Sequence, residues 1–206
     1  MKTMIKTISA IGVGAMLMAA NLTYAKPEVG QPAPSFEMVD TQGNAVDLAS
    51  LEGKTVIMEW TNHQCPYVRK HYESGNMQAL QKESVSDDVV WVSVLSSAPG
   101  KQGYVEAEEA NSIIAENGAA PTHMILDPSG ELGQKYGAKT TPHMYIINAS
   151  GDLVYMGGID SIPSADKADI ENAENYVRTA LTQIKSGEEI TTPSSRPYGC
   201  SVKYSS

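Results

Sequence analysis

The sequence has few cysteines, because only Cys65 and Cys200 carry a thiol among its 206 residues. Two thiols are too few for a fold held together by several disulfides, so stability has to come from a hydrophobic core. A single disulfide can still form in an oxidising compartment, and closing so long a loop would stabilise the fold by about 4 to 5 kcal/mol in the chain-entropy model. The pair is therefore either a structural disulfide or a redox-active one.

The chain also lacks an excess of positive charge and, after residue 25, any hydrophobic run long enough to span a membrane. Lys2 and Lys6 precede an apolar run over residues 8–20, and the small residue Ala25 follows, which is the pattern of a secretory signal. We predict cleavage after Ala25, export that is most simply to the periplasm, and no membrane insertion afterwards; an uncleaved anchor is the alternative. Removing residues 1–25 changes the net charge from −9 to −11, which disfavours nucleic acid as a partner.

Strand and helix patterns alternate over residues 26–186, a length that suits one domain. A hairpin is expected over 35–48, and no internal repeat is present. Further strands are expected at 55–60, 89–95, 123–126, 144–147 and 153–156, and helices at 66–82 with a break at 74–76, 104–116, 132–136 and 168–185. This order predicts an α/β sandwich with an N-terminal β-hairpin. Residues 187–206 are rich in turn-forming residues and predict an irregular tail that carries Cys200.

Cys65 lies between a predicted strand and a predicted helix. Residues 56–60 have the composition of a buried strand, and Pro66 is a residue favoured at the first helical position. Cys65 is therefore expected at or beside the helix N-cap, where unpaired backbone N–H groups and the helix dipole stabilise a thiolate. The positive charges of Arg69 and Lys70 act in the same direction. We predict that Cys65 is a nucleophile with a lowered thiol pKa.

Several short motifs accompany this cysteine in a recognisable order. They are Gly30–Phe36 (Gly-Gln-Pro-Ala-Pro-Ser-Phe), Leu48–Lys54 ahead of the first core strand, Asp127–Leu132, Tyr136-Gly137 and Thr141-Pro142. Together they resemble the thioredoxin-like redoxins, the group that includes the alkyl hydroperoxide reductase/thiol-specific antioxidant proteins, over roughly residues 30–184. The resemblance implies a thioredoxin-like fold, with a central mixed sheet flanked by helices, and thiol-dependent oxidoreductase activity without a cofactor.

Thr141-Pro142 is the second feature that this resemblance makes important. Only about one X-Pro bond in twenty is cis in folded proteins, but the family holds the matching proline in cis beside its nucleophile. The resemblance therefore implies a cis bond within van der Waals range of Cys65. The backbone of Thr141 would then form one edge of the site, against which a disulfide or an extended peptide could bind.

Two departures from the family's patterns bear on the reaction. A dithiol oxidoreductase of this fold carries Cys-x-x-Cys, whereas Val68 stands three residues after Cys65. A peroxiredoxin carries Thr-x-x-Cys and a distant arginine, whereas Thr61 lies four residues before Cys65, and Thr141 precedes the proline instead of the usual arginine. Cys65 has no local resolving partner, so Cys200 is its expected partner, in the same chain or across a homodimer.

Four further residues are candidates for the site. His63 can shuttle a proton or tune the thiolate, or it can be a solvated loop residue. Arg69 can pair with a thiolate or an oxyanion, or it can lie on an exposed helix face. Trp60 and Tyr67 flank the thiol and can line a substrate groove, although core packing is the simpler interpretation.

A metal site was the remaining alternative at this edge. Cys65, His63 and His143 would suit copper or zinc if they converged, but their spacing gives no support, so we predict no metal. His71, His123 and His143 are interpreted as structural.

These observations predict an exported redoxin enzyme. The Cys65 thiolate attacks a hydroperoxide or a disulfide, Cys200 resolves the sulfenic acid or mixed disulfide, and a separate dithiol protein is the reductant. One alternative is thiol–disulfide exchange without peroxidase activity. Another is a non-catalytic, metal-binding or partner-binding redoxin whose disulfide is structural. The tail is expected to open at low cost, so that the disulfide is reversible.

Overall fold

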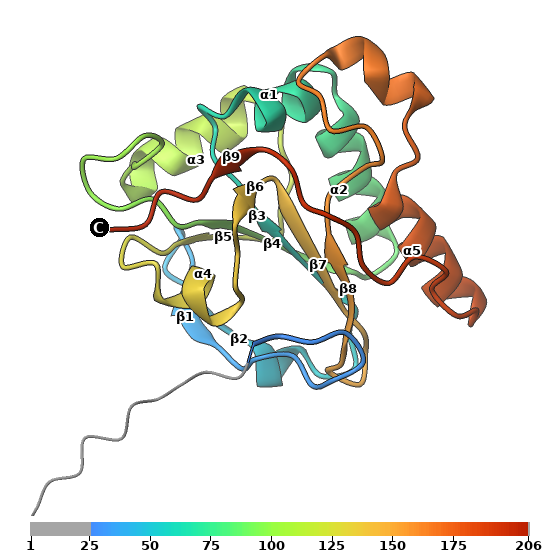
Figure 1. Cartoon of the computed structure of the whole chain (residues 1–206). Helices are drawn as coiled ribbons and strands as arrows, with labels where there is room; N and C mark the ends of the chain where they lie inside the picture. Colours follow the sequence, from blue (N-terminus) through green and yellow to red (C-terminus); the bar gives the residue numbers. More distant parts are fainter. Residues whose placement is uncertain (1–25, 206) are drawn as a thin grey trace, which may run out of the picture.

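The computed structural model of the protein describes residues 26–205 (Figure 1). The predicted signal peptide over residues 1–25 lies outside this range. Within the described residues, no helix combines the length and the hydrophobicity needed to cross a bilayer.

A mixed five-stranded sheet forms the centre of the fold, in the strand order β5-β4-β3-β7-β8. The strands are β3 (Val56–Trp60), β4 (Val90–Leu95), β5 (His123–Leu126), β7 (His143–Ile147) and β8 (Leu153–Gly157). β3, β4 and β5 are parallel, whereas β7 runs antiparallel to β3 and to β8. The central strand β3 is fully buried and ends five residues before Cys65, so the sheet positions the nucleophile segment.

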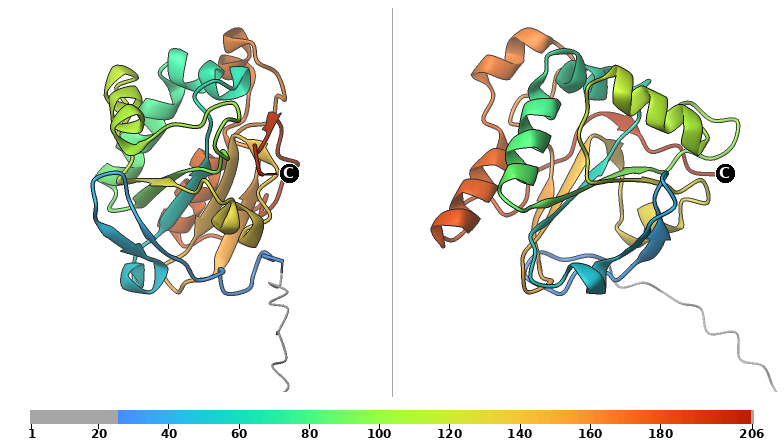
Figure 2. Two further views of the ribbon diagram at one scale, coloured as in Figure 1. Left: turned by 90° about the vertical axis from the view of Figure 1, so that its left-hand side faces the viewer. Right: turned by 180° about the vertical axis from the view of Figure 1, so that it is seen from behind.

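Helices cover both faces of this sheet, as Figures 1 and 2 show. One face carries α1 (Pro66–Glu73), α2 (Asn76–Ser86), α3 (Ala107–Glu116) and α5 (Tyr176–Ser186). The other face carries the hairpin of β1 (Glu37–Val39) and β2 (Ala45–Asp47), the 3-10 helix η1 (Leu48–Leu51) and α4 (Glu131–Lys135). A second 3-10 helix, η2 (Lys167–Asn172), precedes α5. The fold class is the α/β, thioredoxin-like arrangement that the sequence predicts.

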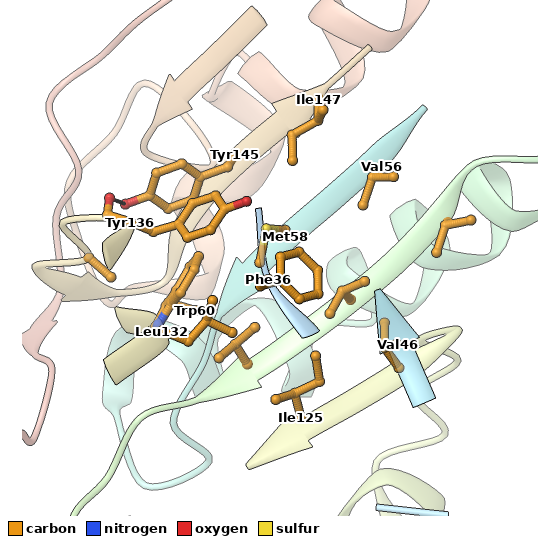
Figure 3. Close-up of a cluster of buried hydrophobic side chains, with 14 of the residues drawn as sticks. Phe36, Val46, Val56, Met58, Trp60, Ile125, Leu132, Tyr136, Tyr145 and Ile147 are labelled. Atoms are coloured by element: carbon orange, nitrogen blue, oxygen red, sulfur yellow. Dashed lines mark hydrogen bonds between the residues drawn. The ribbon is translucent and has the colours of Figure 1, made fainter. Parts of the chain in front are cut away.

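Two hydrophobic clusters hold these layers together, one on each face of β3. Val56, Met58 and Trp60 point into the cluster beneath the N-terminal hairpin and α4 (Figure 3). Ile57 points into the opposite cluster, with Met77 of α2 and other side chains from β4, β7, β8 and α5. Because side chains alternate along a strand, Glu59 faces the same side as Ile57. An acidic side chain is thus buried below α1.

The predicted helix over residues 168–185 is the main difference between expectation and structure. It is two elements, η2 and α5, with a break at 173–175. The side-chain oxygen of Asn175 accepts a hydrogen bond from the backbone N–H of Arg178 at 3.0 Å, so Asn175 begins a new helix. The amphipathic pattern predicts α5 correctly, but the predicted helix begins too early in the sequence.

The C-terminal segment after α5 has little regular structure, but it crosses the molecule and packs against it. Its one strand, β9 (Cys200–Ser201), pairs antiparallel with β6 (Thr140–Thr141), as Figure 1 shows. This pairing places Cys200 opposite Thr141, immediately before Pro142. The tail therefore brings the second cysteine to the edge that the sequence assigned to substrate.

Candidate active site at the two cysteines

Cys65 is the N-cap residue of α1, and Pro66 is its first helical residue. The backbone of Cys65 is extended, with φ −79° and ψ 124°, and its carbonyl accepts hydrogen bonds from the N–H groups of Val68 and Arg69 at 3.0 and 2.9 Å. Its side chain is completely buried. The position predicted from the Cys-Pro pair is confirmed, and the thiol lies at the positive end of the helix dipole.

The Thr141-Pro142 bond is cis, which confirms the expectation drawn from the family resemblance. The carbonyl oxygen of Thr141 accepts a hydrogen bond from the Sγ atom of Cys65 at 3.2 Å. The Thr141 hydroxyl is buried and has no hydrogen-bond partner among residues 26–205. The backbone around the cis proline thus forms one wall of the thiol site.

Cys200 forms the wall on the other side. Its Sγ atom lies 2.6 Å from the Sγ atom of Cys65, and both residues are free thiols in this structure. Gly199 makes this approach possible, because its φ is +135° and a Cβ atom there would lie 2.0 Å from the Thr141 carbonyl oxygen. A side chain at position 199 would push the strand away from the cis proline.

The two thiols have opposite electrostatic environments. Burial raises the pKa of Cys65, but hydrogen bonds with Cys200, with Thr141 and with the backbone of Val68 outweigh it, so its pKa is lowered. Burial and the contact with Cys65 raise the pKa of Cys200 to about 11. The lowered Cys65 pKa agrees with the sequence prediction in direction. The interaction that lowers the pKa of Cys65 most is the hydrogen bond with Cys200, and not the charge of Arg69.

A buried polar cluster holds the tail in place before Cys200. We call Lys70, Asp160 and Tyr198 the latch cluster. The Tyr198 hydroxyl donates to Asp160 Oδ1, and Lys70 Nζ lies 3.3 Å from Asp160 Oδ2 and 5.8 Å from the centre of the Tyr198 ring. Both charged side chains are almost fully buried, and the Tyr67 ring packs edge-to-face on Tyr198 at 5.9 Å. The latch cluster ties the tail to α1 and to the loop after β8.

Backbone and hydroxyl contacts also anchor the tail after Cys200. The Val202 N–H donates to the Lys139 carbonyl at 3.1 Å, and the Lys203 carbonyl accepts from the Ala98 N–H at 2.9 Å. The Tyr204 hydroxyl donates to the Ala138 carbonyl at 2.8 Å. The tail is therefore anchored by long-range partners of which composition gave no sign, and its opening stays a prediction.

Two of the predicted site residues lie elsewhere. Arg69 is exposed, and its guanidinium forms an ion pair with Glu73 at 2.6 Å, one helical turn further along α1. Trp60 is fully buried. The centre of its ring lies 5.4 Å from that of Tyr136 and 5.0 Å from that of Tyr145. Its indole N–H donates a hydrogen bond to the Ser96 hydroxyl at 3.0 Å. Arg69 therefore pairs with a carboxylate instead of the thiolate, and Trp60 belongs to the core instead of a substrate groove.

His63 is close to Cys65 in sequence but lines a cavity of about 220 Å³ between α1, β4 and α3. Its Nδ1 atom is buried and has no hydrogen-bond partner in the part of the chain that the structure describes. Burial lowers the pKa of His63, and the charge of Glu109 opposes that shift. Among residues 26–205, no three His, Cys, Asp or Glu side chains lie where they could hold a metal, so Cys65, His63 and His143 do not converge.

Glu59 is a buried residue beneath the site that the sequence interpretation missed. Its Oε2 atom accepts hydrogen bonds from the Trp91 indole and the Ser93 hydroxyl, each at 3.0 Å, and its Oε1 atom accepts one from Tyr72 at 3.0 Å. Burial raises the pKa of Glu59 against these hydrogen bonds. An acidic residue within the apolar segment Val56–Trp60 was the available signal. The latch cluster had no such signal, because its members are scattered along the chain.

A family profile described as redoxin matches residues 28–175, so the chain belongs to the redoxin family. A curated relative, the thiol-disulfide oxidoreductase ResA of Bacillus subtilis, is 23% identical over 125 residues. That match covers 61% of this chain and 64% of the relative, slightly less than two thirds of its length.

Solved structures agree with the fold. A hypothetical protein from Sinorhizobium meliloti 1021 superposes with a TM-score of 0.73 at 20% identity, covering 88% of this chain and 97% of that one. The thioredoxin domain of a thiol-disulfide oxidoreductase from Bacteroides vulgatus gives 0.50 at 19% identity, covering 70% and 96%. These similarities establish the thioredoxin-like fold of the chain.

Proposed function

We propose that the protein is a thiol–disulfide oxidoreductase whose redox pair is Cys65 and Cys200 of one chain. The observation that carries the proposal is the 2.6 Å separation of the two Sγ atoms across the β6–β9 pairing. A disulfide is about 2.05 Å long, so only a small movement is needed for the bond to form when a disulfide substrate takes two electrons and two protons from the pair. The family membership and the names of the curated relatives support the same class of activity.

The reaction is a two-electron exchange. The Cys65 thiolate attacks one sulfur of a disulfide substrate and releases the other as a thiolate. Cys200, deprotonated, then attacks the Cys65 sulfur of the mixed disulfide, releases the second substrate thiolate and forms the Cys65–Cys200 bond. The substrate gains two electrons and the protein loses two. A separate dithiol protein is the proposed reductant, and export to the periplasm is the proposed setting.

Exchange fits the site better than peroxide reduction does. The contacts of Cys65 Sγ within residues 26–205 are the Thr141 carbonyl and Cys200, and the nearby arginine is paired with Glu73. A peroxidase needs donors that polarise the peroxide. Peroxide reduction stays a second hypothesis, supported by the Cys-Pro dipeptide alone, and a homodimer stays a prediction.

Redox titration with counting of free thiols tests the proposal. We expect two thiols in the reduced protein, none after oxidation, and a midpoint potential above about −300 mV, the upper bound typical of structural disulfides. A midpoint potential below that value would indicate a structural disulfide instead. Assays of disulfide reduction and hydroperoxide consumption with the same dithiol, run side by side, decide between the two substrates.

A further inference from the structure

The two cysteines of the proposed redox pair differ in their exposure to solvent. Cys65 is completely buried between α1, the cis proline and the tail, whereas Cys200 is only half-buried. An attacking thiolate has to approach one sulfur along the S–S axis, so access decides which sulfur reacts.

A cleft opens at Gly199, the residue before Cys200. It has a volume of about 560 Å³ and is lined by Thr140, Asp160, Tyr176 and the tail residues 195–199. Thr140 is paired with Ser201, and Gly199 directly precedes Cys200, so the cleft reaches the β6–β9 ladder next to the half-buried residue Cys200. The exposed side chain of Arg196 lies at this cleft and has no ion pair among residues 26–205.

We propose that the reductant's thiolate enters through this cleft and attacks the Sγ atom of Cys200, releasing Cys65 as the leaving thiolate. This inference rests on the proposed function. The new bond joins the reductant sulfur to Cys200, the Cys65–Cys200 bond breaks, and its electron pair stays on Cys65. The second thiolate of the dithiol reductant then attacks the first reductant sulfur and releases Cys200, which takes up a proton. The reductant is oxidised to a disulfide, and the protein regains two thiols.

The chemistry of the leaving group agrees with this direction. A thiol of lower pKa leaves faster, and Cys65 has the lowered pKa of the pair. Attack on the Cys65 sulfur would have to release Cys200, whose pKa is raised to about 11. The burial of Cys65 and the order of the two pKa values in the dithiol state therefore favour the same sulfur.

The test maps the first mixed disulfide. The oxidised protein is mixed briefly with 2-mercaptoethanol, quenched with acid, alkylated and digested, and the adduct is located by mass spectrometry at several early times. Extrapolated to zero time, the adduct should lie on Cys200 in an excess of about tenfold, with Cys65 alkylated. In urea, where both sulfurs are exposed, the excess should disappear. An early adduct on Cys65 in the folded protein would overturn the inference.

The cleft itself is tested with Arg196→Glu. The initial rate with an anionic thiol such as mercaptosuccinate should fall about twofold to fivefold, while the rate with neutral 2-mercaptoethanol stays the same. An unchanged ratio of the two rates would remove the cleft as the route of entry. If no Cys65–Cys200 disulfide forms in the wild type, the proposed function itself is wrong. If the disulfide forms but the first adduct lies on Cys65, only the proposed attack on Cys200 is wrong, so the two failures are distinguishable.

Discussion

The segment around Cys65 and the segment around Cys200 meet at one site, but they are built from different information. Cys65 is placed by neighbouring residues, because a strand ends at Trp60 and a helix begins at Pro66. Cys200 is placed by partners far away in the sequence, among them Thr141 and Asp160. The nucleophile is thus a local feature of the chain, whereas its partner depends on tertiary structure.

This difference has a chemical consequence. The local environment of Cys65, a helix start, does not by itself account for its lowered pKa, since the largest lowering cause is the contact with Cys200. The tail therefore completes the electrostatics of the nucleophile while it also covers it.

The largest effect is expected from removing the cysteines one at a time. Cys65→Ser should abolish disulfide reduction, because no nucleophile of lowered pKa remains. Cys200→Ser should retain one stoichiometric reaction of Cys65 and lose turnover by about 10³-fold or more, since resolution fails. Single-turnover and steady-state kinetics with the same disulfide substrate measure both. Turnover of Cys200→Ser at the wild-type rate would show that Cys200 does not resolve.

Gly199→Ala should have the next largest effect, because it displaces the tail without changing either thiol. The φ of +135° and the clash with the Thr141 carbonyl would displace β9, with a strain of about 1 to 3 kcal/mol. We expect disulfide formation on oxidation to slow by about tenfold or more, while Cys65 still reacts with small alkylating agents.

Gly118→Ala is the matched control for that experiment. Gly118 also has a positive φ, +60°, but a Cβ atom there meets nothing within 4 Å, and the residue lies after α3. Its disulfide should form at the wild-type rate. Equal slowing in both variants would mean that general destabilisation, rather than the approach of Gly199 to Thr141, controls the reaction.

The sequence predicted the fold and the nucleophile because both follow from local patterns. The strand Val56–Trp60 and the helix start at Pro66 lie where hydrophobicity and proline indicate. Arg69 is paired with Glu73, four residues on and on the same helix face, which is a partner that the sequence interpretation did not weigh. The sequence interpretation also did not predict how the tail is anchored. Pro, Gly and Ser composition reports local flexibility and says nothing of the contacts of Tyr198.

Tyr198→Phe tests the latch cluster with a smaller change. It removes the hydroxyl that donates to the buried Asp160 and keeps the ring that packs on Tyr67. Because a buried acceptor loses a donor, docking of the tail should weaken by about 1 to 3 kcal/mol. Amide hydrogen exchange should become faster over residues 198–204 and stay unchanged in β3.

Tyr67→Phe is the control for the latch experiment, because it keeps the same ring contact from the other partner. If hydrogen exchange in the tail rises as much in Tyr67→Phe as in Tyr198→Phe, the loss of a hydroxyl at this ring contact, and not the loss of the Asp160 hydrogen bond in particular, loosens the tail.

The smallest effect is a shift in the pKa of Cys65 between two variants of its partner. Cys200→Ser keeps an O–H donor beside Cys65, whereas Cys200→Ala removes the donor. The two substitutions should change the burial of Cys65 by similar amounts. Because the hydrogen bond with Cys200 is the largest cause that lowers the pKa of Cys65, its loss should raise that pKa. We expect the pKa to be higher in Cys200→Ala than in Cys200→Ser, so at a fixed pH between the two values the alanine variant holds less thiolate. Thiolate absorbance titration measures each value directly, since Cys65 is then the only cysteine. Identical titrations would show that the side chain of residue 200 does not lower the pKa of Cys65, and would leave the backbone hydrogen bonds and Thr141 as the causes.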